Sequence, residues 1–472
     1  MASSRRGALC APVLQGRTNA GARFGGPGGP GPSEGMGRPR RWPNGDNVLV
    51  NPMPSFAGVR SPPLREGMQA QGRWAWGMGR KRPKGPYWAT LPFGKEAKML
   101  PTFMRSWFFA SAVGLLLILS CDQTREPVRI GFVATLTGRY SDLGVSARDG
   151  VILAVEERNQ KGGILGRPIE LLIRDDKNDP RTALEVDQEL IGLGVIGLIG
   201  HTLSTMSFEV VPLLERTKTV MISPTTASPL LSGEKDFFFR VYEPVDKEVL
   251  DLAQWIAQDK KISRMAVMYD ARNPIYAQDY AERFEKALKN WQGYVPVTIA
   301  TRGGDLTELV RAAETLQIFD LNSLLIVHNA LDTVVILEIL RRNRWVGTAF
   351  ASPWSMTREL LEQGGQAVEG LHSIVPFLPD HPSEKYQNFR KAFLQRFRKE
   401  PDFAAVCGYE AAQVLFKAFE KARASGRALA DAILEIGEFE GLQSKIVMDE
   451  FGDPKREKFR VTIREGKMER AS

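Results

Sequence analysis

Two groups of hydroxyl side chains are the residues of this sequence best placed for chemistry: HTLST at 201–205 and TTAS at 225–228. Each group follows a short apolar run, at 195–200 and at 219–223, and each precedes an expected helix start. A helix N-terminus offers free N–H groups and a partial positive charge, so it suits an anion. The hydroxyls would therefore converge on a small anionic group, and a carboxylate fits best. The simpler alternative is that Ser204 and Ser228 only cap their helices.

These hydroxyls need elements that bring them together, and the apolar pattern predicts two runs of alternating strand and helix. The first run has strands at 128–134, 168–174, 195–200 and 219–223, with helices at 146–160 and after 178. The second run has helices at 246–259, 277–288, 305–316 and 333–342, with strands at 264–269, 294–299, 321–328 and 349–352. Such alternation predicts an α/β fold with a parallel sheet for each run. Ligands of open parallel sheets bind beyond the carboxyl ends of the strands, where both hydroxyl groups lie.

The pattern changes after Gly370. A strand is expected at 372–375, followed by long helices at 383–399 and 402–425 and a short helix near 429–436. The chain then predicts a terminal hairpin, with strands at 442–448 and 459–463 joined around Gly452.

The positive charge of the chain belongs to its N-terminal segment. The full chain carries a net charge of +8, but residues 1–98 hold 16 Lys and Arg against 4 Asp and Glu, a net of +12. The remaining residues therefore carry a net charge of −4. Because the body is not basic, nucleic-acid binding loses its main support, and we expect no nucleic-acid partner.

Residues 1–98 are typical of a disordered segment, because 18 Gly and 13 Pro make up about a third of them without any period. Three explanations compete: a basic disordered arm, a targeting segment, or translation from an over-extended start site. We favour the last, since the next segment is a complete export signal that needs a free N-terminus. The segment is therefore expected to be missing from the mature protein.

Residues 99–120 have the pattern of a lipoprotein signal peptide. Met104 and Arg105 supply a start and a positive charge, and WFFASAVGLLLIL at 107–119 is too short for an ordinary transmembrane helix. The tetrad ILSC at 118–121 resembles a bacterial lipobox, which implies cleavage before Cys121 and lipid attachment to its sulfur. The alternative is an uncleaved membrane anchor. In both cases we expect an exported body, periplasmic or at the cell surface, that is tethered to the membrane.

The cysteines predict a body without disulfides. If Cys121 is lipidated and Cys10 is absent, Cys407 has no intramolecular partner. Cys407 lies in the apolar stretch AAVCGYEAA, which favours a buried small residue over a nucleophile. The body of about 345 residues is long enough for two lobes with separate cores.

Five motifs, in this order, resemble a known family. They are LTGRYSDLG at 136–144, NQKGGILGRPIELLIRDD at 159–176, IGHTLST at 199–205, MISPTTASPLL at 221–231 and FEGLQSKIVMDEFGD at 439–453. Together they are similar to type I periplasmic binding proteins of the leucine/isoleucine/valine-binding group, over about residues 128–468.

The resemblance implies an α/β fold of two doubly wound parallel-sheet lobes joined by three crossovers. One lobe would comprise 127–241 plus 372–441, and the other 242–371 plus 442–472. A small-molecule ligand would bind in the cleft, the lobes would close on it by a hinge motion, and an ABC permease would receive it.

The resemblance also implies ligand-binding residues. Ser204 matches the family's carboxylate-binding serine, Ala227 occupies the usual threonine position of a second cluster, and Tyr276 matches an aromatic wall. His328 lies where the family has a tyrosine. The full set of candidates is Ser204, Thr205, Thr225, Thr226, Ala227, Tyr276, His328 and Trp354.

Trp354 departs from the family pattern, because it follows Pro353 at the place of the acid that pairs with the ligand's α-ammonium. A buried ammonium needs an opposite charge or several acceptors, and a tryptophan face holds a cation more weakly than a carboxylate does. The expected ligand is therefore a carboxylate with an apolar or aromatic body, or a small amide, rather than a standard α-amino acid.

We expect neither a cofactor nor a metal. Asp175 and Asp176 at a strand end could bind a metal, but such a pair more often caps a helix or faces water. The four histidines lack metal spacing, although His201 and His328 each end a strand at the expected cleft and are candidates for ligand contact. No GxSxG elbow surrounds Ser204, so an enzyme such as a lipid-anchored hydrolase is the least favoured function. A sensory module that signals through a partner is the other alternative to a solute-binding lipoprotein.

Overall fold

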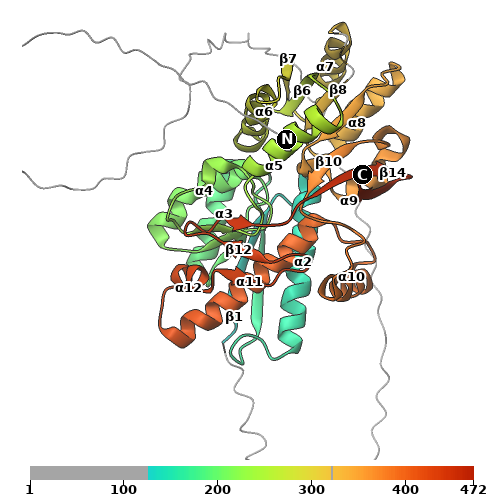
Figure 1. Ribbon diagram of the computed structural model, residues 1–472. Coiled ribbons are helices and arrows are strands. Elements are labelled where there is room, and N and C mark those ends of the chain that lie inside the picture. Colours follow the sequence, from blue (N-terminus) through green and yellow to red (C-terminus); the bar gives the residue numbers. More distant parts are fainter. Residues whose placement is uncertain (1–125, 320, 322, 472) are drawn as a thin grey trace, which may run out of the picture. The chain divides into compact units, whose positions relative to one another are not determined.

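The computed structural model of this protein describes residues 126–319, 321 and 323–471. The Gly/Pro-rich segment, the predicted signal peptide and Cys121 lie outside these residues. Within the described part, no helix is both long enough and apolar enough to cross a membrane. The described chain is built on two main sheets, and we call the parts built around them lobe 1 and lobe 2 (Figure 1).

Lobe 1 contains a five-stranded sheet of order β2-β1-β3-β4-β5, in which every pair is parallel. Its strands are β1 (Val128–Ala134), β2 (Ile169–Asp175), β3 (Leu198–Gly200), β4 (Met221–Ser223) and β5 (Phe238–Arg240). The helices between them are α2 (Ser141–Gln160), α3 (Pro180–Gly192) and α4 (Ser204–Thr217). All but one residue of β1 are buried, as expected for a strand covered on both faces.

Three later helices join lobe 1: α10 (Glu384–Phe397), α11 (Phe403–Ser425) and α12 (Leu429–Ile436). In Figure 1, α11 lies along α2, and glycine on each helix makes this close approach possible. A Cβ on Gly150 would lie 2.0 Å from the Ala405 carbonyl oxygen, and one on Gly408 would lie 2.2 Å from the Ala147 carbonyl oxygen. This packing holds the first turns of α11 against the middle of α2.

Lobe 2 contains a seven-stranded sheet of order β15-β14-β10-β9-β8-β6-β7. Its strands are β6 (Arg264–Asp270), β7 (Tyr294–Thr301), β8 (Ser323–Val327), β9 (Thr348–Ala351), β10 (His372–Val375), β14 (Phe459–Arg464) and β15 (Lys467–Arg470). β6 to β10 pair in parallel, while β14 and β15 are antiparallel at one edge. The helices are α5 (Asp246–Gln254), which continues as a π-helical turn at Trp255–Asp259, α6 (Pro274–Lys289), α7 (Leu306–Ile318), α8 (Ala330–Arg342) and α9 (Arg358–Gly364).

The chain passes between the lobes three times, after β5, after β10 and before β14. This arrangement confirms the predicted fold class of two α/β lobes joined by three crossovers, with the two antiparallel edge strands as an addition.

Two expectations about the C-terminal part are wrong. The terminal hairpin does not form, because β12 (Ile446–Met448) pairs with β11 (Glu438–Phe439) and β13 (Pro454–Lys455), whereas β14 pairs with β10 and β15. The strand expected in lobe 1 at 372–375 is β10, which lies between β9 and β14 in the lobe 2 sheet. A strand's own residues do not reveal its neighbours in a sheet, so the sequence pattern found the strands but not their partners.

Candidate functional site

A small pocket lies between the lobes, beyond the carboxyl ends of β3, β4 and β9. It contains about 310 Å³ of empty space, part of it open to solvent. Both lobes supply its lining, which consists of Leu143, Thr202, Leu203, Ser204, Thr225, Ala227, Tyr242, Asn273, Tyr276, Pro353, Trp354 and Phe403.

The lobe 1 side of the pocket is made by the two hydroxyl turns. Ser204 is the first residue of α4, and Thr225 follows β4. The Thr225 hydroxyl donates to the Thr202 carbonyl at 2.8 Å, which ties the turns together. The Thr202 hydroxyl is buried and has no hydrogen-bond partner among the described residues. An unpaired hydroxyl beside a helix N-terminus can donate to an anionic ligand.

The capping alternative holds at one of the two serines. The Ser228 hydroxyl accepts a hydrogen bond from the Leu230 N–H and caps a single 3-10 turn, Pro229–Leu231. The expected helix after the second hydroxyl group is therefore wrong, because Ser232 and Gly233 end this segment after one turn. At the first group, the N-cap residue of α4 is Leu203, which has no capping side chain, and the Thr205 N–H of the first turn donates to Asn273 of lobe 2. The first residue of α4, Ser204, lines the pocket.

The lobe 2 side of the pocket is aromatic. The rings of Tyr276 and Trp354 meet edge to face at 5.8 Å, and Trp354 also stacks on Tyr140 of lobe 1 at 6.0 Å. Burial, together with the charge of Glu248, raises the pKa of Tyr276 well above its usual value, so this ring stays neutral. The Trp354 indole N–H is buried and has no hydrogen-bond partner within the described chain.

Thr205 and Thr226, both predicted to bind ligand, do not line the pocket. Thr205 instead reaches across the cleft, where its N–H and hydroxyl donate to Asn273 Oδ1 at 3.2 and 2.9 Å. Thr226 is fully buried behind the pocket, with its hydroxyl 2.7 Å from that of Ser207. Ser204, Thr225, Ala227, Tyr276 and Trp354 are the predicted residues that the structure brings together.

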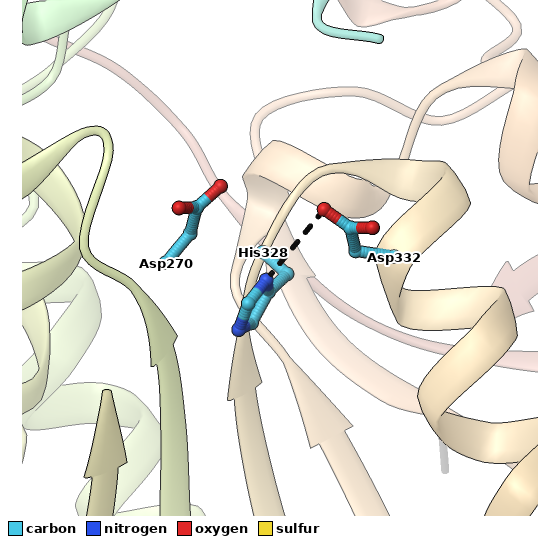
Figure 2. A group of neighbouring side chains, drawn as sticks. All are labelled: Asp270, His328 and Asp332. Atoms are coloured by element: carbon cyan, nitrogen blue, oxygen red, sulfur yellow. Dashed lines mark ion pairs between the residues drawn. The ribbon is translucent and has the colours of Figure 1, made fainter. Parts of the chain in front are cut away.

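His328 does not line the pocket either, and lies in a buried group with two acids. Figure 2 shows His328 beside Asp332, with Asp270 facing them from the neighbouring strand. Atoms that could ligate a metal lie within 4.8 Å of one another in these three side chains. The Arg139 guanidinium already supplies a cation here, because its Nε donates to Asp332 Oδ1 at 2.6 Å. Burial favours the neutral acid, but the nearby His328 ring, 3.9 Å away, and the hydrogen bond from Arg139 lower the pKa of Asp332 to about 2.

His201 is an internal charge beneath the pocket rather than a ligand contact. Its ring lies between two buried carboxylates, with Nδ1 2.7 Å from Asp176 and Nε2 3.2 Å from Asp187. Burial alone would lower the pKa of His201, but the two carboxylates raise it to about 10. The His201 carbonyl accepts a hydrogen bond from the Ser223 hydroxyl at 2.7 Å, which connects this charged group to the second hydroxyl turn.

Sequence reasoning missed Leu143, Tyr242, Asn273 and Phe403 as lining residues. Leu143 and Phe403 lie in the first turns of α2 and α11, whose packing together no local pattern reveals. Asn273 precedes Pro274 at the start of α6 after a strand end, a position that points to the same sheet edge as the hydroxyl turns. That signal could have found it.

Asp142, next to the pocket residue Leu143, makes the stability of the protein depend on pH. Its Oδ2 accepts from the Thr357 hydroxyl of lobe 2 at 2.9 Å, and burial followed by the charge of Glu359 raises its pKa to about 7. The folded state therefore binds this proton more tightly than the unfolded chain, so stability falls as pH rises from about 4 to 7. We expect Asp142→Asn to raise the thermal midpoint at pH 8 and to change it little at pH 4.

The matched control is Asp179→Asn. Asp179 is an exposed N-cap whose pKa is lowered by the Thr182 N–H, so its replacement should bring no gain at pH 8. Thermal denaturation of both variants at the two pH values tests the assignment, and equal behaviour of the variants would contradict it.

Comparison with known proteins agrees with this architecture. A family model described as periplasmic binding protein matches residues 127–464. Leu/Ile/Val-binding protein homolog 2 of Brucella abortus is 26% identical over 339 residues, which covers 69% of this chain and 87% of the relative. The solved structure of the leucine binding protein LivK from Thermotoga maritima matches with a TM-score of 0.67 and 23% identity, over 73% of this chain and 98% of that chain. A solute binding protein of an ABC transporter from R. palustris, in complex with benzoate, matches with a TM-score of 0.67 and 17% identity, over 73% and 95% of the two chains. The resemblance found in the sequence is confirmed.

Proposed function

We propose a function from one premise: the chain belongs to the periplasmic binding protein family, which its residues 127–464 match. Members of this family are exported, periplasmic and bind solutes. We infer that this chain captures a small carboxylate between its lobes and delivers it to the permease of an ABC importer. The observation that carries this proposal is that Ser204, the first residue of α4, lines the pocket beside the unpaired Thr202 hydroxyl.

The ligand that we propose has a single carboxylate, an apolar or aromatic body and no ammonium group. The described lining of the pocket contains hydroxyl, amide and indole donors and aromatic rings, but no acidic side chain. A buried ammonium without an opposite charge is costly. One solved structure of this fold is named a leucine binding protein, and another is in complex with benzoate. The fold itself therefore admits ligands with an ammonium group and ligands without one.

The acids close to the pocket are already bound by other partners. Glu248 lies behind Tyr242 and pairs with Lys458 at 3.2 Å. Asp270 accepts from the Tyr140 hydroxyl, and Asp332 pairs with Arg139. None of the three lines the pocket, which supports a ligand without a positive charge. A small amide is the second candidate, because its carbonyl oxygen could accept from the same donors.

The test of this function is the identity of what the protein carries. Small molecules released from the purified protein by denaturation would be identified by mass spectrometry, and each candidate would be assayed for its effect on the thermal midpoint. We expect a monocarboxylate that raises the midpoint by several degrees. Absence of any bound molecule, together with no shift from amino acids, oxo acids or aromatic acids, would overturn the proposal.

We also propose that the mature protein begins at a lipidated Cys121, on the lipobox-like tetrad ILSC. Mass spectrometry of the N-terminal peptide from the native membrane should find Cys121 as the first residue, with a diacylglycerol on its sulfur. A peptide that continues upstream through residues 107–119 would contradict the lipid anchor without affecting the solute-binding function.

A further inference from the structure

The loop after β1 crosses the rim of the cleft and joins the two lobes outside the pocket. Arg139 of this loop donates through Nε to Asp332 Oδ1 at 2.6 Å, and the Tyr140 hydroxyl donates to Asp270 Oδ2 at 2.6 Å. Both acids belong to lobe 2 and are fully buried, while about a third of the Arg139 side chain is exposed. Hydrogen bonds to a charged group of this kind are roughly twice as strong as neutral ones.

Lobe 2 holds the two carboxylates in place by itself. Asp270 Oδ1 accepts from the N–H groups of Arg272 and Gly303, at 2.9 and 3.2 Å. Asp332 accepts from the Gly304 N–H at 3.1 Å and from the Asn329 amide at 2.6 Å. The carboxylates of Asp270 and Asp332 therefore keep their positions when the lobes are apart. Closure of the lobes then brings Arg139 and Tyr140 to carboxylates that are already ordered.

Tyr140 connects this contact to the pocket. Its ring stacks on Trp354, which lines the pocket. The pocket lining does not include Arg139, Asp270 or Asp332. If Arg139 and Tyr140 moved away from lobe 2, Trp354 would lose its stacking partner. The hydrogen bonds to Asp332 and Asp270 would break in the same movement.

We propose that Arg139 and Tyr140, with Asp332 and Asp270, form an interlobe lock that stabilises the closed form and lengthens the residence of the ligand. The proposal rests on the solute-binding function, because it concerns the hinge motion around that site. The lock acts through the closed form alone and makes no contact with the ligand, so it adds to the affinity for every ligand that the closed pocket accepts. Arg139 and Tyr140 are positioning residues in this scheme.

The test measures closure without any ligand, in the full chain. Spin labels would be placed on two exposed positions, one in each lobe, through Arg181→Cys and Val346→Cys, and their distance would be measured by electron-electron double resonance. Cys407 is buried and should remain unlabelled, and the other two cysteines of the chain, Cys10 and Cys121, would be replaced by serine. We expect Arg139→Gln to lower the ratio of closed to open molecules by about tenfold. Asp332→Asn should have a similar effect, and the double variant should add little to either, because both remove the same contact.

Two further variants show whether a smaller closed population in Arg139→Gln comes from loss of the interlobe lock or from misfolding. Arg139→Lys keeps the charge without the planar fork and should restore part of the closed population. Arg272→Gln removes a second arginine at the same rim and should leave the distances unchanged. An unchanged distribution in Arg139→Gln, or an equal shift in Arg272→Gln, would overturn the lock. Because these measurements contain no ligand, they succeed or fail independently of the solute-binding proposal.

Discussion

Replacing Trp354 by alanine is expected to raise the dissociation constant of the proposed carboxylate ligand about 100-fold. Trp354 is the aromatic residue through which both lobes meet at the pocket, with Tyr276 at 5.8 Å on one side and Tyr140 at 6.0 Å on the other. Its removal takes away the apolar wall and leaves Tyr140 without its stacking partner. Titration calorimetry with the acid recovered from the protein measures the effect.

Two variants show which property of Trp354 matters. Trp354→Phe keeps a ring but removes the unpaired indole N–H, and a loss of about tenfold is expected if that group donates to the ligand. The matched control is Trp345→Ala, since Trp345 donates to the Leu321 carbonyl at the opposite end of β8 and does not line the pocket. This control should lower the thermal midpoint and leave the dissociation constant within about twofold. Equal affinity of wild-type protein and Trp354→Ala would show that the ligand binds elsewhere.

Replacing His201 by leucine is expected to lower the free energy of unfolding by about 3–5 kcal/mol. The substitution leaves the buried carboxylates of Asp176 and Asp187 facing an apolar side chain with no cation between them. One oxygen of Asp187 already lacks a hydrogen-bond partner among the described residues, and His201 is the partner of the other. The substitution therefore removes the hydrogen bond that His201 makes with this buried carboxylate. Urea denaturation at pH 7 measures the change.

The pH dependence identifies the charge of His201 as the cause. A histidine whose pKa rises from about 6.5 unfolded to about 10 folded contributes its full stability below pH 6.5 and loses it as pH rises through 10. The difference in stability between wild-type protein and His201→Gln should therefore be largest near pH 6 and shrink by pH 10.5.

His372 provides the control for this variant. Burial, together with Lys260 and Arg464, lowers its pKa to about 4, so it is neutral at pH 7. Its Nδ1 forms a hydrogen bond with the Thr462 hydroxyl at 2.7 Å. His372→Gln should cost about 1 kcal/mol or less. Similar losses for the two histidines would contradict an ion-paired His201.

The fold was predictable wherever a local pattern determines an element. β1, β10 and α12 have the predicted limits, because apolar runs and flanking glycines define them within a few residues. Strand pairing was not predictable where strands distant in sequence meet. β14 pairs with β10 and not with β12, and the residues of β14 do not show which strand lies next to it.

The site was predictable on the same principle. Ser204 and Thr225 follow buried strands, and the carboxyl ends of parallel strands share one edge of a sheet, so their convergence could be expected. The position of His328 after β8 satisfies the same rule, but its Nε2 lies 3.1 Å from the Thr301 hydroxyl and its ring lies beside Asp332, outside the pocket. Leu143 and Phe403 enter the pocket only because α2 and α11 pack together, which is a property of the folded chain.

The central claim is that this pocket takes a carboxylate and rejects an ammonium, and matched pairs of ligands test it most directly. Titration calorimetry would compare 4-methyl-2-oxopentanoate with L-leucine, and phenylpyruvate with L-phenylalanine, because the members of each pair share the carboxylate and the apolar body and differ in the ammonium group. Because burying an unpaired ammonium costs several kcal/mol, the oxo acid of the better-binding pair should bind at least about 100-fold more tightly than the amino acid. L-leucine binding as tightly as its oxo acid would contradict the account.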